Sequence, residues 1–125
     1  MVSFLDADWI EAFDAAARQV AVPGDVRLTV QQVVHREGGE EVRYHVVAAD
    51  GRLRVHPGQA DSPDVTLTQD YQVAAALSRG ELNAQQALAA GGVKLGGDIG
   101  RLLLHGGALT ALGDAFATLR TLTTY

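Results

Sequence analysis

The sequence predicts an α+β fold in which helices cover one face of an antiparallel sheet. Two observations lead to this prediction: apolar residues recur at helical spacing near both ends of the chain, and four short strand-like runs lie between them. Helices and strands that are segregated along a chain in this way commonly pack as a sheet with helices on one side. The chain has 125 residues, so we expect residues 1–125 to form a single domain.

The first half of the chain is predicted to be a helix followed by strands. Apolar residues fall three or four apart from residue 6 to residue 20, and Pro23-Gly24 then ends the helix. The strand-like runs cover residues 25–36, 41–49, 52–56 and 64–68. Gly38-Gly39 and Asp50-Gly51 can supply the positive φ angles of tight two-residue hairpin turns. We therefore expect an antiparallel meander, with the register of its first hairpin left open.

The second half is predicted to be mostly helical. We expect helices at residues 70–78, 83–90, 99–105 and 108–122, and one short strand at residues 93–95. Gly80, Gly91-Gly92 and Gly106-Gly107 are the expected stop signals, and Asp98 can cap the helix that follows it.

The composition argues against several classes of function. Without cysteine the chain can form no disulfide, thiol nucleophile or thiolate metal site, and we expect a cytoplasmic protein. The net charge is −5 and Lys94 is the only lysine, so we expect no nucleic-acid partner. The apolar runs fall short of the ~18 residues of a spanning helix, so we expect no stable membrane insertion.

The sequence carries no recognisable catalytic or metal-binding motif. The glycine-rich stretch 91–100 lacks the Lys and Ser or Thr of a phosphate-binding loop, and no serine stands in a Gly-x-Ser-x-Gly frame. The histidines are not spaced as metal ligands on a helix. They are His35, His45, His56 and His105. We therefore expect no cofactor, no metal and no enzymatic activity.

Apolar residues are frequent in the second half of the chain, with alanine and glycine between them. They can form an ordinary core, because every amphipathic helix buries its apolar stripe. They can also line a cavity for an apolar guest, since small residues and an aromatic content of only 6% leave space unfilled. Composition leaves both interpretations open.

Four segments of the middle of the chain point to a known family. They are Asp64-Val65-Thr66-Leu67-Thr68, Leu77-Ser78-Arg79-Gly80-Glu81-Leu82-Asn83, Gln85-Gln86-Ala87 and Val93-Lys94-Leu95-Gly96-Gly97-Asp98. Together they resemble the sterol carrier protein type 2 (SCP2-like) lipid- and sterol-binding domain. Trp9 and the ending Thr123-Thr124-Tyr125 are similar to its small, free-standing bacterial members.

The resemblance implies a five-stranded, mainly antiparallel sheet with helices covering one face and a hydrophobic tunnel. It also implies non-enzymatic carriage of a sterol, fatty acid or fatty acyl-CoA. The candidate lipid-binding residues are Phe13, Val30, Leu77, Leu82, Leu88, Val93, Leu95, Ile99, Leu102, Leu103, Leu109, Leu112 and Phe116.

The sequence departs from the family at four positions. Ala84 stands where the family often has Pro, Leu88 where Phe is common, Ala89 where Met is common, and Gly92 where a basic residue is usual. We expect a cavity of different shape that lacks one charge toward an anionic headgroup. The last helix, after Gly106-Gly107, can be a lid, a homodimer surface or a docked helix.

Two other functions stay open. A small α+β enzyme could transfer protons on an apolar substrate, which would need a carboxylate or tyrosine inside the pocket. A self-associating interaction module could keep the fold and lose the cavity.

Overall fold

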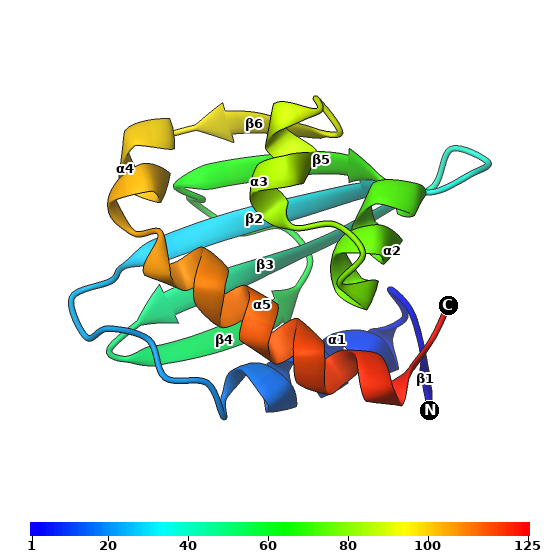
Figure 1. Ribbon diagram of the computed structural model, residues 1–125, viewed down its shortest axis with the longest axis horizontal. Coiled ribbons are helices and arrows are strands. Elements are labelled where there is room, and N and C mark those ends of the chain that lie inside the picture. Colours follow the sequence, from blue (N-terminus) through cyan, green and yellow to red (C-terminus); the bar gives the residue numbers. More distant parts are fainter.

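A five-stranded sheet forms the centre of the protein in the computed structural model (Figure 1). The structure describes the backbone of residues 1–125 and the side chains of all of them except residues 84, 85 and 109. The strands of the sheet are β2 (Leu28–His35), β3 (Glu41–Ala49), β4 (Arg52–Pro57), β5 (Val65–Asp70) and β6 (Val93–Gly97). Their spatial order is β4-β3-β2-β5-β6.

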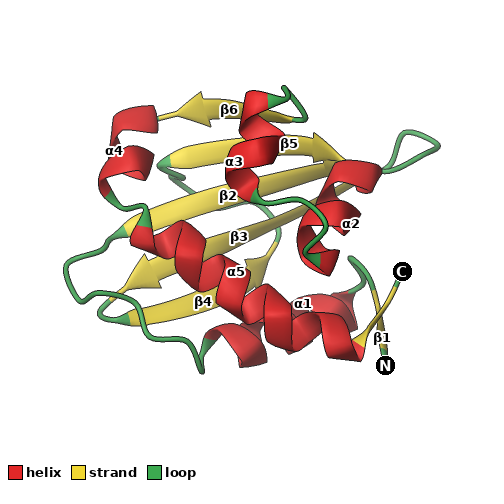
Figure 2. Cartoon of the chain, in the orientation of Figure 1, coloured by secondary structure: helices red, strands yellow, loops and turns green.

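The helices gather on one face of this sheet (Figure 2). They are α1 (Ala7–Ala17), α2 (Tyr71–Arg79), α3 (Ala84–Ala89), α4 (Ile99–Leu104) and α5 (Gly107–Leu119). The expected α+β class, with a mostly antiparallel five-stranded sheet and helices over one face, is confirmed.

The fourth predicted strand pairs differently from the meander expected for it. β2, β3 and β4 are antiparallel neighbours, but β5 lies parallel to β2, with Val65 opposite Val30. The reason is that the segment between β4 and β5 crosses the outer face of the sheet rather than turning back at its edge. Parallel neighbours need such a crossover connection, which the strand pattern alone does not reveal.

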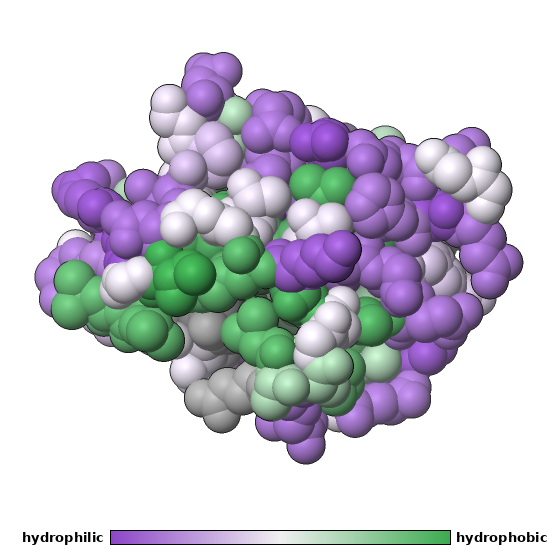
Figure 3. Space-filling view, turned by 90° about the horizontal axis from the view of Figure 1, so that it is seen from above, coloured by the Kyte–Doolittle hydropathy of each residue, from purple (hydrophilic) through white to green (hydrophobic). Residues whose placement is uncertain are grey.

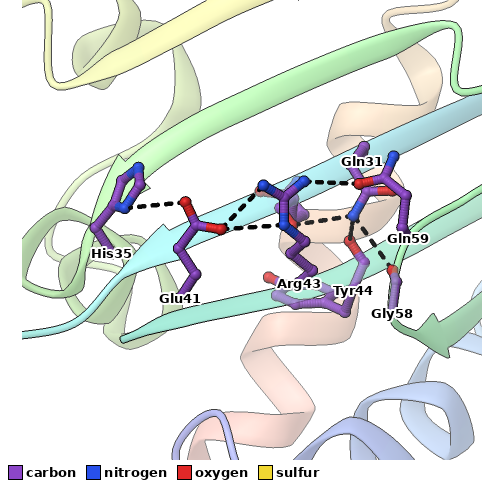
Figure 4. A network of polar contacts seen from close by, with 8 residues as sticks. Gln31, His35, Glu41, Arg43, Tyr44, Gly58 and Gln59 are labelled. Carbon is purple, nitrogen blue, oxygen red and sulfur yellow. Dashed lines mark hydrogen bonds and ion pairs between the residues drawn. The ribbon is translucent and has the colours of Figure 1, made fainter. Parts of the chain in front are cut away.

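The crossing segment covers the outer face and buries a glutamine there (Figure 4). Gln31 is fully buried, and its Nε2 donates to the carbonyl oxygens of Tyr44 at 3.1 Å and Gly58 at 3.3 Å. Its Oε1 accepts from the backbone N–H of Ala60 at 2.7 Å. Apolar residues on this face, such as Val33, are buried as well, which is why the alternation of β2 is ambiguous in the sequence.

The first hairpin has a longer turn than predicted. The last pair of the hairpin is His35 of β2 and Glu41 of β3, so residues 36–40 form the connection. Gly38 and Gly39 do have the predicted positive φ angles, 91° and 90°. The second turn is the expected two-residue one, with Asp50 and Gly51 at φ of 55° and 74°. The register places Val30 opposite Val46 and Gln32 opposite Tyr44 on the inner face.

The helix ends follow the capping signals of the sequence. The Asp70 carboxylate accepts from the N–H of Val73 at 2.9 Å, and α2 ends at Gly80, whose φ is 78°. Asn83 and Gln86 form a capping box at the start of α3. α5 ends three residues before the predicted position, where a single 3₁₀ turn, η1 (Arg120–Leu122), takes over.

A short ladder that the sequence did not indicate joins the two ends of the chain. β1 (Val2–Ser3) pairs in parallel with β7 (Thr123–Thr124). The N–H of Phe4 donates to the carbonyl of Thr124 at 2.9 Å. The ladder therefore brings the first residues and the end of α5 together beside α1 (Figure 1).

Helix α1 is held to the sheet edge by one carboxylate. Asp14 accepts from Arg54 Nε at 3.0 Å and from the backbone N–H of Val55 at 2.8 Å, both on β4. Burial raises the pKa of Asp14, but these hydrogen bonds and the charges of Arg54 and Arg18 outweigh burial and leave the pKa below its ordinary value of 3.8.

All seven aromatic side chains form one connected cluster between α1, the ends of the chain and the inner sheet face. Trp9 is fully buried and its ring centroid lies 4.9 Å from Phe4, 5.2 Å from Phe13 and 5.5 Å from Tyr44. Phe13 in turn lies 4.9 Å from Phe116 of α5. The remaining contacts add Tyr71 and Tyr125 through Phe4. The interior beyond this cluster is left to smaller, aliphatic side chains.

Candidate functional site

A cavity of about 350 Å³ lies between the inner face of the sheet and the helices, with part of the aromatic cluster in its wall. Its walls are mostly apolar, and they come from α1, β2, β3, β5, β6 and every later helix. The lining residues are Phe4, Trp9, Gln32, Tyr44, Leu67, Gln69, Ala74, Leu77, Gly80, Leu82, Asn83, Leu88, Val93, Leu102, Thr110, Leu112, Gly113, Phe116 and Arg120.

The structure brings seven of the candidate lipid-binding residues together around this cavity. They are Leu77, Leu82, Leu88, Val93, Leu102, Leu112 and Phe116. These residues come from α2, the α2–α3 connection, α3, β6, α4 and α5, so segments far apart in sequence share one wall. Their contact with a ligand stays a prediction.

The other candidates lie elsewhere. Phe13 and Val30 are buried in the core, and Leu95 is half-buried against that core. Ile99 and Leu103 point outward and are 45% and 77% exposed. The side chain of Leu109 lies outside the described residues.

Two of the candidates on α4 (Ile99–Leu104) point away from the interior. Leu102 is turned toward the interior and has 3% exposure. Ile99, Leu103 and Leu104 are left in solvent. The apolar surface at the α4 end of the molecule is visible on the left of Figure 3.

Sequence reasoning missed the polar part of the wall. Gln69 Nε2 donates to Gln32 Oε1 at 2.6 Å, and the two side chains are only 6% and 7% exposed. Strand alternation could have found Gln69, because it shares a face with Val65 and Leu67. Asn83, a lining residue too, stands out in the sequence only as a helix start and as part of a family motif.

Two of the departures from the family pattern lie away from the cavity wall. Leu88 lines the cavity, but Ala89 is exposed. A Cβ at Gly92 would lie 3.2 Å from Cγ2 of Val73, so that position packs against α2. Any change of cavity shape at these three positions is therefore expected from Leu88. The side chain of Ala84, the fourth departure, lies outside the described residues.

The described cavity wall contains no Asp or Glu, and the hydroxyl of Tyr44 is the weak acid in it. Burial raises the pKa of Tyr44 well above its ordinary value of 10.0, because the phenolate would lose its hydration. The hydroxyl therefore stays protonated and neutral, and it is a poor general base near neutral pH.

Helix α5 closes the cavity and is docked on α1. Ala111, Ala115 and Leu119 are buried along its inner side, and Phe116 reaches the ring of Phe13. Small residues at this contact let the two helix backbones approach closely. Opening of α5 as a lid stays a prediction.

A family model identifies the chain. The model described as "SCP-2 sterol transfer family" matches residues 10–109. The chain belongs to the SCP-2 sterol transfer family. The match runs from α1 to the first turn of α5 and includes most of the cavity wall. No curated protein sequence matches this chain.

Solved structures share the fold of this SCP-2 family member. A possible sterol carrier protein from Thermus thermophilus has a TM-score of 0.75 at 16% identity, covering 93% of this chain and 89% of that one. A crystal structure of sterol carrier protein 2 has a TM-score of 0.74 at 16% identity, covering 90% and 97%. Palmitated SCP2L2 from Aedes aegypti has a TM-score of 0.64 at 24% identity, covering 85% and 93%.

Membership of the SCP-2 family supports binding and transfer of a lipid or sterol. The proteins of this family are lipid carriers rather than enzymes. Within the described part of the chain, no helix has the length and hydrophobicity needed to cross a membrane.

Proposed function

We propose that residues 1–125 act as one lipid-binding domain, which takes a single apolar ligand into the cavity and carries it without changing it chemically. The ligand class is a sterol, a fatty acid or a fatty acyl chain. The observation that supports this proposal most strongly is the cavity of about 350 Å³ with mostly apolar walls, to which aliphatic residues and part of the aromatic cluster both contribute.

The physical driving force is burial of the ligand. Each methylene group moved from water into an apolar site contributes about 0.8 kcal/mol, so a long chain can bind tightly with few hydrogen bonds. The cavity volume is near the lower end of the ~300–1,000 Å³ of typical ligand pockets, which favours one slender ligand. The palmitated state of the Aedes aegypti protein makes palmitate a suitable first probe.

The test combines two measurements on the full chain. Native mass spectrometry of protein purified without delipidation should show an added lipid mass. Trp9 is the only tryptophan and lines the cavity, so a brominated fatty acid should quench its fluorescence in a saturable way, and excess unlabelled palmitate should restore it. Absence of both a bound mass and saturable quenching would refute the proposal.

A further inference from the structure

Two buried nitrogen atoms in the described part of the chain have no hydrogen-bond partner. They are Nε1 of Trp9 and Nε of Arg120. Both residues line the cavity, and both nitrogens can only donate a hydrogen bond. A buried donor without an acceptor carries the full cost of its lost hydration. A ligand with a hydrogen-bond acceptor could therefore satisfy a buried donor of the cavity wall.

Arg120 differs from most other arginines in its surroundings. Six arginines have a carboxylate within 4.0 Å, whereas Arg120 forms no ion pair with any described residue. The acidic residue next to Gly80 in sequence, Glu81, is paired with Arg79. The positive charge of Arg120 is thus available to a ligand in the cavity.

Gly80 makes the space that the Arg120 side chain occupies. A Cβ at Gly80 would lie 2.5 Å from Nη1 and 2.8 Å from Cζ of Arg120, so the guanidinium lies directly against the end of α2. At this helix end the amides of Gly80, Glu81 and Leu82 donate to the carbonyls of Ala76 and Leu77. No hydrogen bond from Nε of Arg120 to a carbonyl is found among the described residues.

We propose that Arg120 is an anion-binding subsite of the cavity and selects an amphiphile with one apolar chain and an anionic oxygen headgroup. The inference rests on the proposed lipid binding and adds the charge of the ligand to it. A guanidinium pairs strongly with carboxylate or phosphate oxygens. The protein carries a net charge of −5 and would otherwise repel anions, so a local cation is needed for this selectivity.

The position of Arg120 sets it apart from the family pattern. It lies eleven residues beyond the last residue of the family match, which ends at 109. The basic residue that was expected near the headgroup is replaced by Gly92, which packs against Val73. Arg120 supplies a positive charge from the turn η1, later in the sequence than Gly92.

The experiment compares three probes that share a sixteen-carbon chain: palmitate, hexadecyl phosphate and the neutral hexadecanol. Affinities are measured on delipidated full-length protein by displacement of a brominated fatty acid from Trp9. Arg120→Met removes the charge and the donors while keeping an apolar side chain over Gly80. Arg52→Met removes an exposed positive charge at a residue that does not line the cavity and forms no ion pair with a described residue, and is the matched control.

We expect Arg120→Met to weaken both anionic probes by about tenfold to a hundredfold, the usual range for a hydrogen bond to a charged group. Hexadecanol binding should change by less than about twofold, and Arg52→Met should change the binding of all three probes by less than about threefold, as exposed charges contribute little. If only hexadecyl phosphate responds, the headgroup is a phosphate, and if only palmitate responds, it is a carboxylate. Either result supports the subsite.

The proposal is overturned if Arg120→Met leaves the affinities of both palmitate and hexadecyl phosphate, each relative to hexadecanol, at their parent values. Arg120→Gln provides a second variant for the case in which the methionine variant does not fold, judged by circular dichroism. The parent protein alone gives a further check, because equal affinity for all three probes contradicts the subsite. Failure of the parent to bind any of the three probes refutes the proposed function instead, so the two failures are distinguishable.

Discussion

The glutamine pair in the cavity wall gives a prediction with a clear magnitude. Gln69 Nε2 donates to Gln32 Oε1 at 2.6 Å, and both side chains are more than nine-tenths buried. Replacing one of them by leucine leaves the other amide without this partner in an apolar surrounding. An unpaired buried polar group costs about 1–3 kcal/mol. Replacing both by leucine removes the unpaired amide and adds buried apolar surface.

The prediction is therefore a strong coupling in a double-mutant cycle. We expect the free energies of unfolding of Gln32→Leu, Gln69→Leu and the double variant to deviate from additivity by about 1–2 kcal/mol, with the double variant more stable than the sum predicts. Urea unfolding followed by circular dichroism, on delipidated protein, measures each value. Delipidation matters because a bound ligand adds its own stabilisation.

A control cycle separates the pair from general effects of leucine. Gln72 lies on the exposed side of α2, so Gln32→Leu combined with Gln72→Leu should be additive within about 0.5 kcal/mol. If the Gln32 and Gln69 cycle is additive within the same limit, the claim that this hydrogen bond offsets the cost of burying the two amides is refuted. The 2.6 Å contact would then contribute nothing measurable to folding.

Three further predictions concern the helices. The pKa of Asp14 is lowered in the folded state. The Asp14 carboxylate therefore stabilises the fold above its unfolded pKa of about 3.9, and this stabilisation is lost as the pH falls through the folded pKa. Asp14→Asn should flatten the pH dependence of the urea unfolding midpoint between about pH 5 and about pH 2. A Cβ at Gly113 in α5 would meet nothing within 4 Å, so Gly113→Ala should raise the free energy of unfolding by about 1 kcal/mol. Gly97→Ala should lower the free energy of unfolding, because Gly97 has a φ of 90° and a Cβ there would lie 2.5 Å from the carbonyl oxygen of Asp64. Ala74→Phe should fill the cavity and abolish Trp9 quenching by brominated fatty acid in a folded protein, while Gln72→Phe on the exposed side of the same helix should leave quenching unchanged.

Local signals in the sequence predicted the elements well. Asp50-Gly51 encodes a two-residue turn through its own φ preferences, and Asp70, Gly80 and Asn83 define helix ends by hydrogen bonds to backbone atoms a few residues away. These interactions are complete within one turn of the chain. A sequence can therefore reveal them without any knowledge of the tertiary structure.

Non-local pairings could not be predicted in the same way. The parallel alignment of β5 with β2 depends on where residues 58–64 cross the sheet, and the ladder of β1 with β7 joins residues more than a hundred positions apart. Neither leaves a periodic pattern. The parallel pair nevertheless determines the site, because it sets Gln69 beside Gln32 across two strands that are distant in sequence.

The apolar spacing along the helices predicted part of the candidate site, because α2 and α5 each place candidates on the cavity. The same spacing in α4 puts Ile99, Leu102 and Leu103 on one face, but of these three Leu102 alone is buried. Arg120 escaped notice because a single arginine after an apolar helix is ordinary in sequence. Only the burial of its Nε and its position against Gly80 distinguish it.

The placement of the aromatic rings explains how this small domain can keep a cavity and a stable core at once. A void lined by apolar groups costs stability in proportion to its size, so the rest of the interior must be packed well. All seven aromatic rings lie in one cluster, at whose centre Phe4, Trp9, Phe13 and Tyr44 are buried and make ring contacts of 4.9–6.0 Å. The cluster joins α1, α5 and the chain ends, and much of the cavity wall is left to aliphatic residues on short elements. Phe13 belongs to the aromatic cluster without lining the cavity, and Leu88 lines the cavity outside the cluster, so truncating Phe13 should lower stability more than ligand affinity, whereas truncating Leu88 should have the reverse effect.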